Sequence, residues 1–234
     1  MRRECLFLAR SGSEFLFNTI APVYGLFFDY QRRQFAHSFQ LAAPELDLSE
    51  FKSALDVGCG TGALAAYLSD KGLSVTGADP AAGMLKIAKR KLKGKPITFV
   101  QANVLERLPF ADQAFDLSIA SFVAHGLQPG ERKKMYREMG RVSRSKVVIY
   151  DYNQKRAVLT NVLEWLERGD YFRFIKQAES EMRDCMSDLK QCFSTVRVVH
   201  VNRQAALYIC TPTERTPSDV SNSESASGSA ATVD

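Results

Sequence analysis

From residue 51 onward, the hydrophobic and polar positions follow two periods that alternate along the chain. Short apolar runs, rich in β-branched residues, stand at 54–57, 74–79, 97–103, 116–121 and 146–152. Between them, apolar residues recur with the spacing of an amphipathic helix at 63–71, 80–93 and 130–143. Strands that alternate with helices predict right-handed crossovers and a parallel sheet that is covered on both faces.

The pattern changes toward both ends of the chain. Residues 13–46 are rich in aromatic side chains and have a helical pattern, as do residues 156–189. Two strand-like runs follow at 195–201 and 204–210, and only Asn202 and Arg203 separate them. Because a two-residue connection requires an antiparallel hairpin, we expect an α/β fold with a seven-stranded mixed sheet whose last strand is antiparallel.

Length and composition predict one domain with additional segments at both ends. With 234 residues, of which 45% are hydrophobic, the chain can form one substantial core. We expect an N-terminal helical cap segment at 1–50, a core at 51–210 that carries a second helical cap at about 156–190, and a tail at 211–234. The tail is made of Ser, Thr, Pro, Ala and acidic residues, a composition that predicts disorder.

Charge, cysteines and hydropathy restrict the location and the partners. No apolar stretch approaches the roughly 18–20 residues that span a bilayer. The five cysteines lack the paired spacing of a metal site, and their odd number is typical of reduced thiols in a cytoplasmic protein. The formal net charge is +5, and the densest basic run lies at 86–95. No aromatic residues interleave with that run, so we interpret it as a solvated helix face and expect no nucleic-acid partner.

The strongest motif lies at 55–62, which reads Leu-Asp-Val-Gly-Cys-Gly-Thr-Gly. Gly58, Gly60 and Gly62 allow the backbone to turn sharply out of a strand and to approach a ligand that a Cβ would exclude. The helix that follows then offers N–H groups and a positive dipole end to that ligand. These features predict a site for a nucleotide-type cofactor.

The glycines alone leave two kinds of cofactor open. With Ala63 they also satisfy the G-x-G-x-x-G/A pattern of dinucleotide-binding folds, so an NAD-dependent oxidoreductase is one alternative. Asp56 lies inside the strand, where dinucleotide sites usually have an apolar residue, and Asp79 ends the next strand at a spacing that suits ribose hydroxyls. With Asp56 included, the segment resembles the first motif of class I S-adenosylmethionine (SAM)-dependent methyltransferases.

The resemblance extends to the N-terminal segment. Residues 17–24, Phe-Asn-Thr-Ile-Ala-Pro-Val-Tyr, are similar to the start of the small-molecule methyltransferases of the ubiquinone and menaquinone biosynthesis type. It implies a Rossmann-like fold, SAM as cofactor and a small-molecule methyl acceptor. It also implies that the cofactor is held mainly by residues at strand ends, namely Tyr24, Asp56, Gly58, Cys59, Gly60, Asp79, Pro80, Met84, Asn103, Val104 and Ala120.

The same resemblance assigns each of these residues a part of the cofactor. The glycine loop with Asp56 lines the methionine end, Cys59 is a small neighbour there, and Ala120 begins a segment that passes under it. Asp79 receives the ribose hydroxyls, with Pro80 and Met84 packed near ribose and adenine. Asn103 and the N–H of Val104 meet the adenine edge, and Tyr24 closes the site.

His125 is the candidate catalytic residue. It follows the fourth core strand, where relatives place groups that face the substrate, and an imidazole can remove a proton near neutral pH. A histidine that only caps a helix is the other interpretation, and Asp151, Tyr152 and Asn153 are alternative polar contacts. No residues suggest a metal site. A non-catalytic SAM-binding protein is a further alternative, and the oligomeric state is left open.

Overall fold

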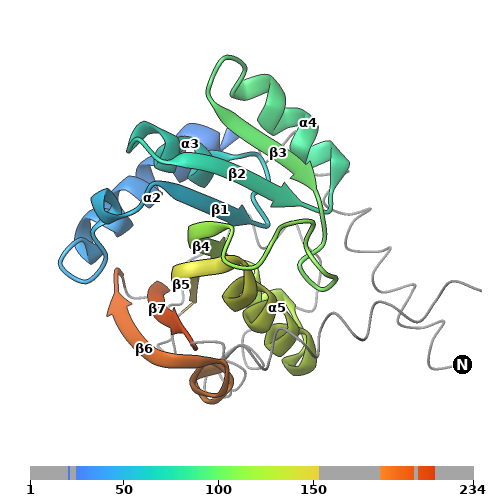
Figure 1. The fold of residues 1–234 in the computed structure, drawn as a ribbon. Coiled ribbons are helices and arrows are strands. Elements are labelled where there is room, and N and C mark those ends of the chain that lie inside the picture. The colour runs from blue at the N-terminus through green and yellow to red at the C-terminus, as the bar shows by residue number, and fades with distance from the viewer. Residues whose placement is uncertain (1–20, 22–24, 153–184, 203–204, 214–234) are drawn as a thin grey trace, which may run out of the picture.

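The computed structural model describes residues 21, 25–152, 185–202 and 205–213. Its centre is one seven-stranded sheet with the strand order β3-β2-β1-β4-β5-β7-β6 (Figure 1). The strands are β1 (Ser53–Val57), β2 (Ser74–Asp79), β3 (Ile97–Gln101), β4 (Phe115–Ser121), β5 (Ser143–Tyr152), β6 (Phe193–His200) and β7 (Ala205–Pro212). Strands β1 to β5 are parallel, and β7 runs antiparallel to both β5 and β6. The predicted mixed sheet and its terminal hairpin are therefore confirmed.

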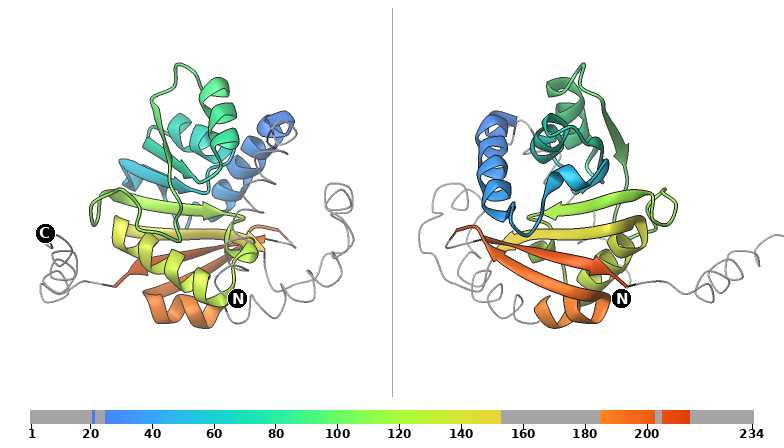
Figure 2. Two further views of the ribbon diagram at one scale, coloured as in Figure 1. Left: turned by 90° about the vertical axis from the view of Figure 1, so that its right-hand side faces the viewer. Right: turned by 60° about the vertical axis from the view of Figure 1, so that its left-hand side comes forward.

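Helices cover both faces of the sheet (Figure 2). One face carries α2 (Phe28–Ala42) and α3 (Ala63–Asp70), with α4 (Ala82–Lys91) beside β2 and β3. The other face carries α5 (Pro129–Val142) and a helical segment at 185–192. Two short 3-10 helices complete the described elements: η1 (Leu48–Glu50) precedes β1, and η2 (Ala124–Gly126) follows β4.

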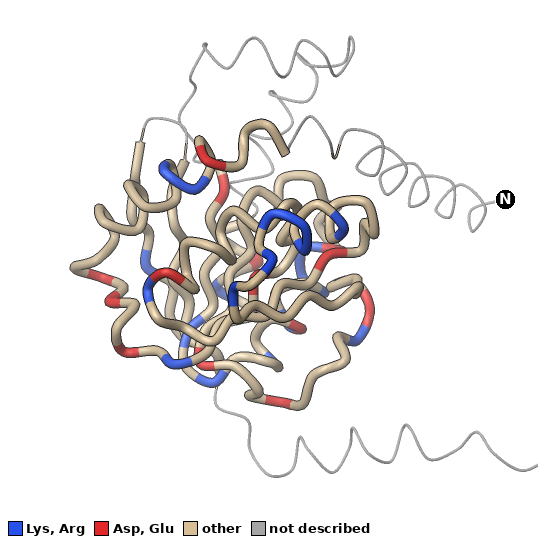
Figure 3. Tube along the Cα trace, turned by 90° about the horizontal axis from the view of Figure 1, so that it is seen from above, with Lys and Arg blue, Asp and Glu red and all other residues tan. Residues whose placement is uncertain are grey.

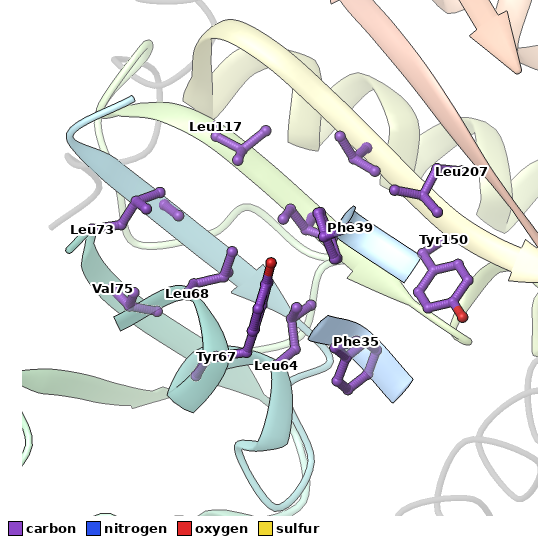
Figure 4. Packing of buried hydrophobic residues seen from close by; sticks show 14 of the residues in the cluster. Phe35, Phe39, Leu64, Tyr67, Leu68, Leu73, Val75, Leu117, Tyr150 and Leu207 are labelled. Atoms are coloured by element: carbon purple, nitrogen blue, oxygen red, sulfur yellow. The ribbon is translucent and has the colours of Figure 1, made fainter. Parts of the chain in front are cut away.

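Alternation along β5 divides the core into two layers. Val147 and Ile149 pack against the α5 face, whereas Val148 and Tyr150 pack against the α2 and α3 face. Such period-two alternation is what the pleat of a strand produces when both faces are buried. The core on the α2 face includes aromatic rings from three elements, as Figure 4 shows for Phe35 of α2, Tyr67 of α3 and Tyr150 of β5.

Helix α2 is part of this main core. Its buried face is formed by Phe28, Phe35, Phe39 and Ala42, which recur at helical spacing. The Tyr150 hydroxyl forms a hydrogen bond with Ser38 Oγ at 2.9 Å. The described part of the expected N-terminal cap segment, 1–50, is therefore joined to the sheet by packing and by a hydrogen bond.

Several expectations lie outside the described residues. They are Tyr24, Asn153, the first 20 residues, the greater part of the second helical cap at 156–190 and the tail from residue 214. Strand β7 ends at Pro212, two residues beyond the predicted end of the core. Among the described helices, none combines the length and the apolar character that a membrane crossing requires.

A buried arginine fastens the loop between β3 and β4. The Arg141 guanidinium donates to the carbonyls of Leu108 and Phe110 and pairs with Glu138 and Asp112, with its side chain only 4% exposed. Arg141 lies at the end of α5, which stops at Val142, and β5 begins at Ser143, so no turn separates the helix from the strand.

Replacing Arg141 with methionine should lower the free energy of unfolding by about 3–5 kcal/mol, because Glu138 and two carbonyls lose their buried cationic donor. Arg144 is a matched control: it pairs with Asp116 at 2.7 Å, but its side chain is 57% exposed. Arg144→Met should cost less than about 1 kcal/mol. Equal losses in urea denaturation of the two variants would contradict this difference.

Candidate functional site

The glycine loop leaves β1 with three residues in the left-handed region. The φ angles are +68° at Gly58, +51° at Gly60 and +82° at Gly62. A Cβ at Gly58 would lie 2.6 Å from Val123 Cγ2, and one at Gly62 would lie 2.8 Å from Leu92 Cδ1. A Cβ at Gly60 would meet no atom of the described residues within 4 Å. Protein packing therefore requires two of the glycines, while the third borders open space.

Substituting each of two glycines with alanine should separate packing from ligand binding. Gly58→Ala should cost about 2–5 kcal/mol of stability, because an unfavourable φ adds to a clash with Val123. Gly60→Ala meets no atom, so it should cost only about 1–2 kcal/mol.

If the space at Gly60 receives a ligand, Gly60→Ala should still weaken that ligand by about tenfold or more, because the new methyl occupies the approach. Thermal unfolding and a ligand titration on both variants measure the two effects. If the Gly60→Ala variant binds the ligand with unchanged affinity, the ligand does not lie against this residue.

Asp79 ties the glycine loop to the end of β2. Its Oδ2 accepts the N–H of Gly60 at 2.8 Å, and its Oδ1 accepts the N–H of Ala81 at 2.8 Å. The residue is 7% exposed. This carboxylate therefore lies where the turn of the glycine loop meets the start of α4, and it holds Gly60 in its left-handed conformation.

Asp56 is a buried carboxylate of a different kind. It is 0% exposed, and neither of its oxygens has a hydrogen-bond partner within the described residues. Burial raises the pKa of Asp56 to about 8, and the negative charge of Asp79 adds to the rise. The backbone N–H of Ala65 in α3 lowers the pKa in part, although its geometry falls short of a full hydrogen bond. An unpartnered buried carboxylate favours a nearby cation.

The end of β3 differs in part from expectation. The strand ends at Gln101 and not at Asn103, whose Oδ1 accepts the N–H of Leu105 at 3.0 Å and so forms a turn. An amide oxygen has a second lone pair, so this bond does not preclude the predicted contact with adenine. The N–H of Val104 donates to no residue within the described chain.

The other predicted cofactor neighbours are packed to different degrees. Met84 is 3% exposed and packs with Ala21, Ala81 and Ile87. The carbonyl of Pro80 accepts from Gln101 Nε2 at 3.0 Å. Ala120 is fully buried in the core on the α5 face. Burial also raises the pKa of the Cys59 thiol well above its usual value, which keeps it neutral and makes it a poor nucleophile.

At the ends of β4 and β5 the structure pairs His125 with Asp151. His125 Nδ1 lies 2.9 Å from Asp151 Oδ1, and the His125 N–H donates to Oδ2 at 3.1 Å. Asp151 is 0% exposed and also accepts the N–H of Tyr152 at 2.8 Å. The Tyr152 ring meets the imidazole edge to face, with centroids 4.9 Å apart. Sequence reasoning had named Asp151 only as an alternative contact and did not predict this pair.

The polar candidates form a row along one edge of the sheet. The carboxyl ends of β3, β2, β1, β4 and β5 are neighbours in that order and lead respectively to Asn103, Asp79, Gly60, His125 and Asp151. Neighbouring strands lie about 4.8 Å apart, so the row is about 19 Å long. This is the edge where open α/β sheets bind their ligands. Among the described residues, no group of three or more His, Cys, Asp and Glu side chains could hold a metal ion.

Comparisons of sequence give one family. Residues 54–146 match the family model described as a methyltransferase domain. A demethylmenaquinone methyltransferase of Paenarthrobacter aurescens is 30% identical over 144 residues, which are 59% of this chain and 54% of that protein. A demethylmenaquinone methyltransferase of Thermus thermophilus is 37% identical over 114 residues, 46% of this chain and 50% of that protein. The chain therefore spans about half the length of these curated relatives.

Comparison with solved structures shows the same fold. The magnesium protoporphyrin IX methyltransferase of Synechocystis, solved with bound SAM, has a TM-score of 0.54 and 15% identity. The match covers 78% of this chain and 80% of that one. Because the identity is this low, the likeness concerns the fold alone.

Proposed function

Because the chain belongs to the class I SAM-dependent methyltransferases, we propose that it transfers a methyl group from SAM to a small-molecule acceptor. The observation that carries this proposal is the junction of the glycine loop with β2. There the Asp79 carboxylate holds the Gly60 N–H, no described atom fills the space at Gly60, and Asp56 lies buried in β1 without a hydrogen-bond partner among the described residues. A ligand with a cationic end and a ribose suits this set of groups.

The residues of the row fit the parts of SAM in the order that the sheet imposes. Asn103 and Val104 would meet the adenine, Asp79 would accept from the ribose hydroxyls, and Pro80 and Met84 would flank them. Asp56, Gly58, Cys59 and Gly60 would line the methionine end with Ala120 as a neighbour in the core, and the expected role of Tyr24 in closing the site falls outside the described residues. The buried carboxylate of Asp56 supports this order, because SAM carries its positive charges at the methionine end and the adjoining sulfur.

Catalysis needs little beyond positioning. When bound, SAM supplies a methyl group on a positively charged sulfur, which is already an activated electrophile. The chain's own residues then hold the acceptor in line and exclude water. We assign His125 as the general base because it follows β4, the strand beside β1 in the row. The Val123 side chain, two residues before His125, lies against Gly58 at the proposed methionine site.

Incubation of the protein with methyl-labelled SAM and a metabolite extract tests the proposed activity. We expect label in the small-molecule fraction and its loss in the Asp79→Ala variant. If S-adenosylhomocysteine raises the melting temperature but no label is transferred, the chain is a non-catalytic SAM-binding protein. If NADH raises it instead, the chain is a dinucleotide enzyme. The antiparallel β7 argues against that second outcome, since a typical dinucleotide domain adds a parallel sixth strand.

A cytoplasmic location and a small-molecule partner are consistent with a role in metabolism. Cys59, Cys185, Cys192 and Cys210 are free thiols, which suits the reducing cytoplasm where we place the protein. In the view of Figure 3, Lys and Arg positions are interspersed with Asp and Glu positions along the described Cα trace. The basic run at 86–95 has no interleaved aromatic residues on which bases could stack, so we propose a small-molecule partner alone.

A further inference from the structure

The second buried aspartate of the site carries an inference that rests on the proposed function and extends it. Asp56 and Asp151 are both 0% exposed at the same edge of the sheet. Asp56 has no hydrogen-bond partner within the described residues, whereas Asp151 accepts three hydrogen bonds, two of them from His125. The donors around Asp151 therefore fix it as an acceptor that holds one histidine.

We propose that Asp151 is a positioning residue that fixes His125 in the tautomer with its proton on Nδ1, so that Nε2 accepts a proton from the methyl acceptor. A carboxylate can only accept hydrogen bonds, so the 2.9 Å contact to Asp151 Oδ1 places a proton on His125 Nδ1. In the neutral ring the lone pair then belongs to Nε2. The second bond, from the backbone N–H of His125 to Oδ2, fixes the start of η2 and with it the ring's position.

Three titratable groups besides His125 lie within electrostatic range of Asp151. Burial raises the pKa of the Tyr136 hydroxyl of α5 and of the Tyr208 hydroxyl of β7, and it raises the pKa of the Cys185 thiol to about 11. All three groups therefore stay neutral near pH 7. Arg132 of α5 is a cation on this side; it donates to the Leu127 carbonyl at 2.8 Å and acts electrostatically on Tyr136 and Cys185.

Two aromatic rings give the base an apolar flank. Phe122 has a φ of +54° and is 38% exposed, and its ring packs 5.3 Å from that of Tyr152. Tyr152 in turn packs against His125. A non-glycine residue in the left-handed region is strained, and such strain is retained where the surroundings require it. The ring of Phe122 thus remains at the surface, with the Tyr152 ring as the shared neighbour between it and the base, where a flat apolar acceptor can stack.

This arrangement defines the class of acceptor. The attacking atom carries a hydrogen that leaves as a proton, as in a hydroxyl on a flat apolar scaffold. Its oxygen forms the bond to the methyl carbon, the proton passes to His125 Nε2, and the carbon–sulfur bond breaks with both electrons retained by sulfur. Acceptors without such a proton, such as thioethers, have no use for the base.

The first test measures the histidine itself, in the complex of the full chain with S-adenosylhomocysteine. In ¹⁵N spectra of the imidazole, we expect the wild type to have its neutral-state proton on Nδ1. Asp151→Asn should shift the tautomer population and lower the titration midpoint of the His125 ring by about one pH unit or more, because a nearby negative charge is lost. The matched control is Asp188→Asn, another buried carboxylate, which pairs with Lys133 at 3.1 Å and should change neither quantity.

The second test measures transfer from labelled SAM to 2-naphthol and to 2-(methylthio)naphthalene. We expect transfer to the hydroxyl probe alone, a loss of about 100-fold or more in His125→Asn, and a smaller loss in Asp151→Asn with its acid limb moved to lower pH. The proposal is overturned if Asp151→Asn leaves the ring's tautomer and titration as in the wild type. It is also overturned if methylation of a probe survives His125→Asn unchanged. Absence of S-adenosylhomocysteine binding would instead refute the proposed function.

Discussion

Replacing Asp79 with alanine is expected to weaken the binding of S-adenosylhomocysteine by about 100-fold or more. Two ribose hydroxyls that donate to one carboxylate form charge-assisted hydrogen bonds, and their loss costs about 3 kcal/mol or more. In the wild type the N–H groups of Gly60 and Ala81 donate to Asp79, so the same substitution also removes their acceptor. Calorimetric titration of wild type and variant measures the difference.

Asp47→Ala is the matched control for that experiment. Asp47 accepts the N–H of Ser49 at 2.9 Å, so its removal also deletes a local carboxylate-to-backbone bond, but at η1, which precedes β1. We expect a loss of about 1 kcal/mol of stability and unchanged affinity for the ligand. An Asp79→Ala variant that folds and binds as tightly as the wild type would remove Asp79 from the site.

Asp56→Asn is expected to stabilise the protein without ligand, and increasingly so as the pH rises. Burial holds the pKa of Asp56 at about 8, well above the value of about 3.9 of an unfolded chain. Between these values the folded state keeps a proton that the unfolded state has released. The wild type therefore loses up to about 1.4 kcal/mol of stability per pH unit over this window, and the asparagine variant does not.

The ligand should reverse the sign of that effect. A cationic methionine end beside Asp56 favours the carboxylate, so wild-type binding near pH 7 should release up to about one proton, and Asp56→Asn should bind more weakly with no release. Melting temperatures from pH 5 to 8.5 and titrations in buffers of different ionisation enthalpy measure both effects. A stability difference between wild type and Asp56→Asn that is constant over this range would contradict the account.

Asp116→Asn provides the opposite sign as a control. Hydrogen bonds from the Lys52 and Ser53 N–H groups lower the pKa of Asp116, and Arg144 adds to the effect. Its stabilising contribution is present above the unfolded pKa and is lost as the pH falls through the folded one. Asp116→Asn should therefore be less stable than the wild type at pH 7, and the gap should close on acidification.

The hydrophobic pattern predicted most of the fold because each core strand is bounded by a change of period. Strand β2 has the predicted bounds, and the hairpin of β6 and β7 follows from a connection too short for a crossover. Helix α5 and strand β5 were harder to delimit, since one passes into the other at Ser143 without a turn. Arg141 shows a further limit of the hydrophobic pattern, which treats every cationic residue as exposed, whereas this side chain is buried.

The site was predictable where its signal is local. The glycine loop and Asp79 have a fixed spacing and lie together as expected. The pairing of His125 with Asp151 joins residues 26 apart, so only the adjacency of β4 and β5 reveals it. Both residues follow neighbouring strands at the same edge, and that signal could have found the pair. The state of Asp56 depends on burial in three dimensions and on the charge of Asp79, which no motif encodes.

The central claim, that the glycine loop, Asp56 before it and Asp79 after it bind an adenosyl sulfonium donor, is tested most directly by calorimetry on the folded full chain. S-adenosylhomocysteine and NADH are titrated separately at two temperatures, so that a heat that vanishes at one of them is still detected. The account predicts saturable binding of one S-adenosylhomocysteine per chain and none of NADH. Absence of heat with S-adenosylhomocysteine at both temperatures, in protein that melts cooperatively, would contradict it.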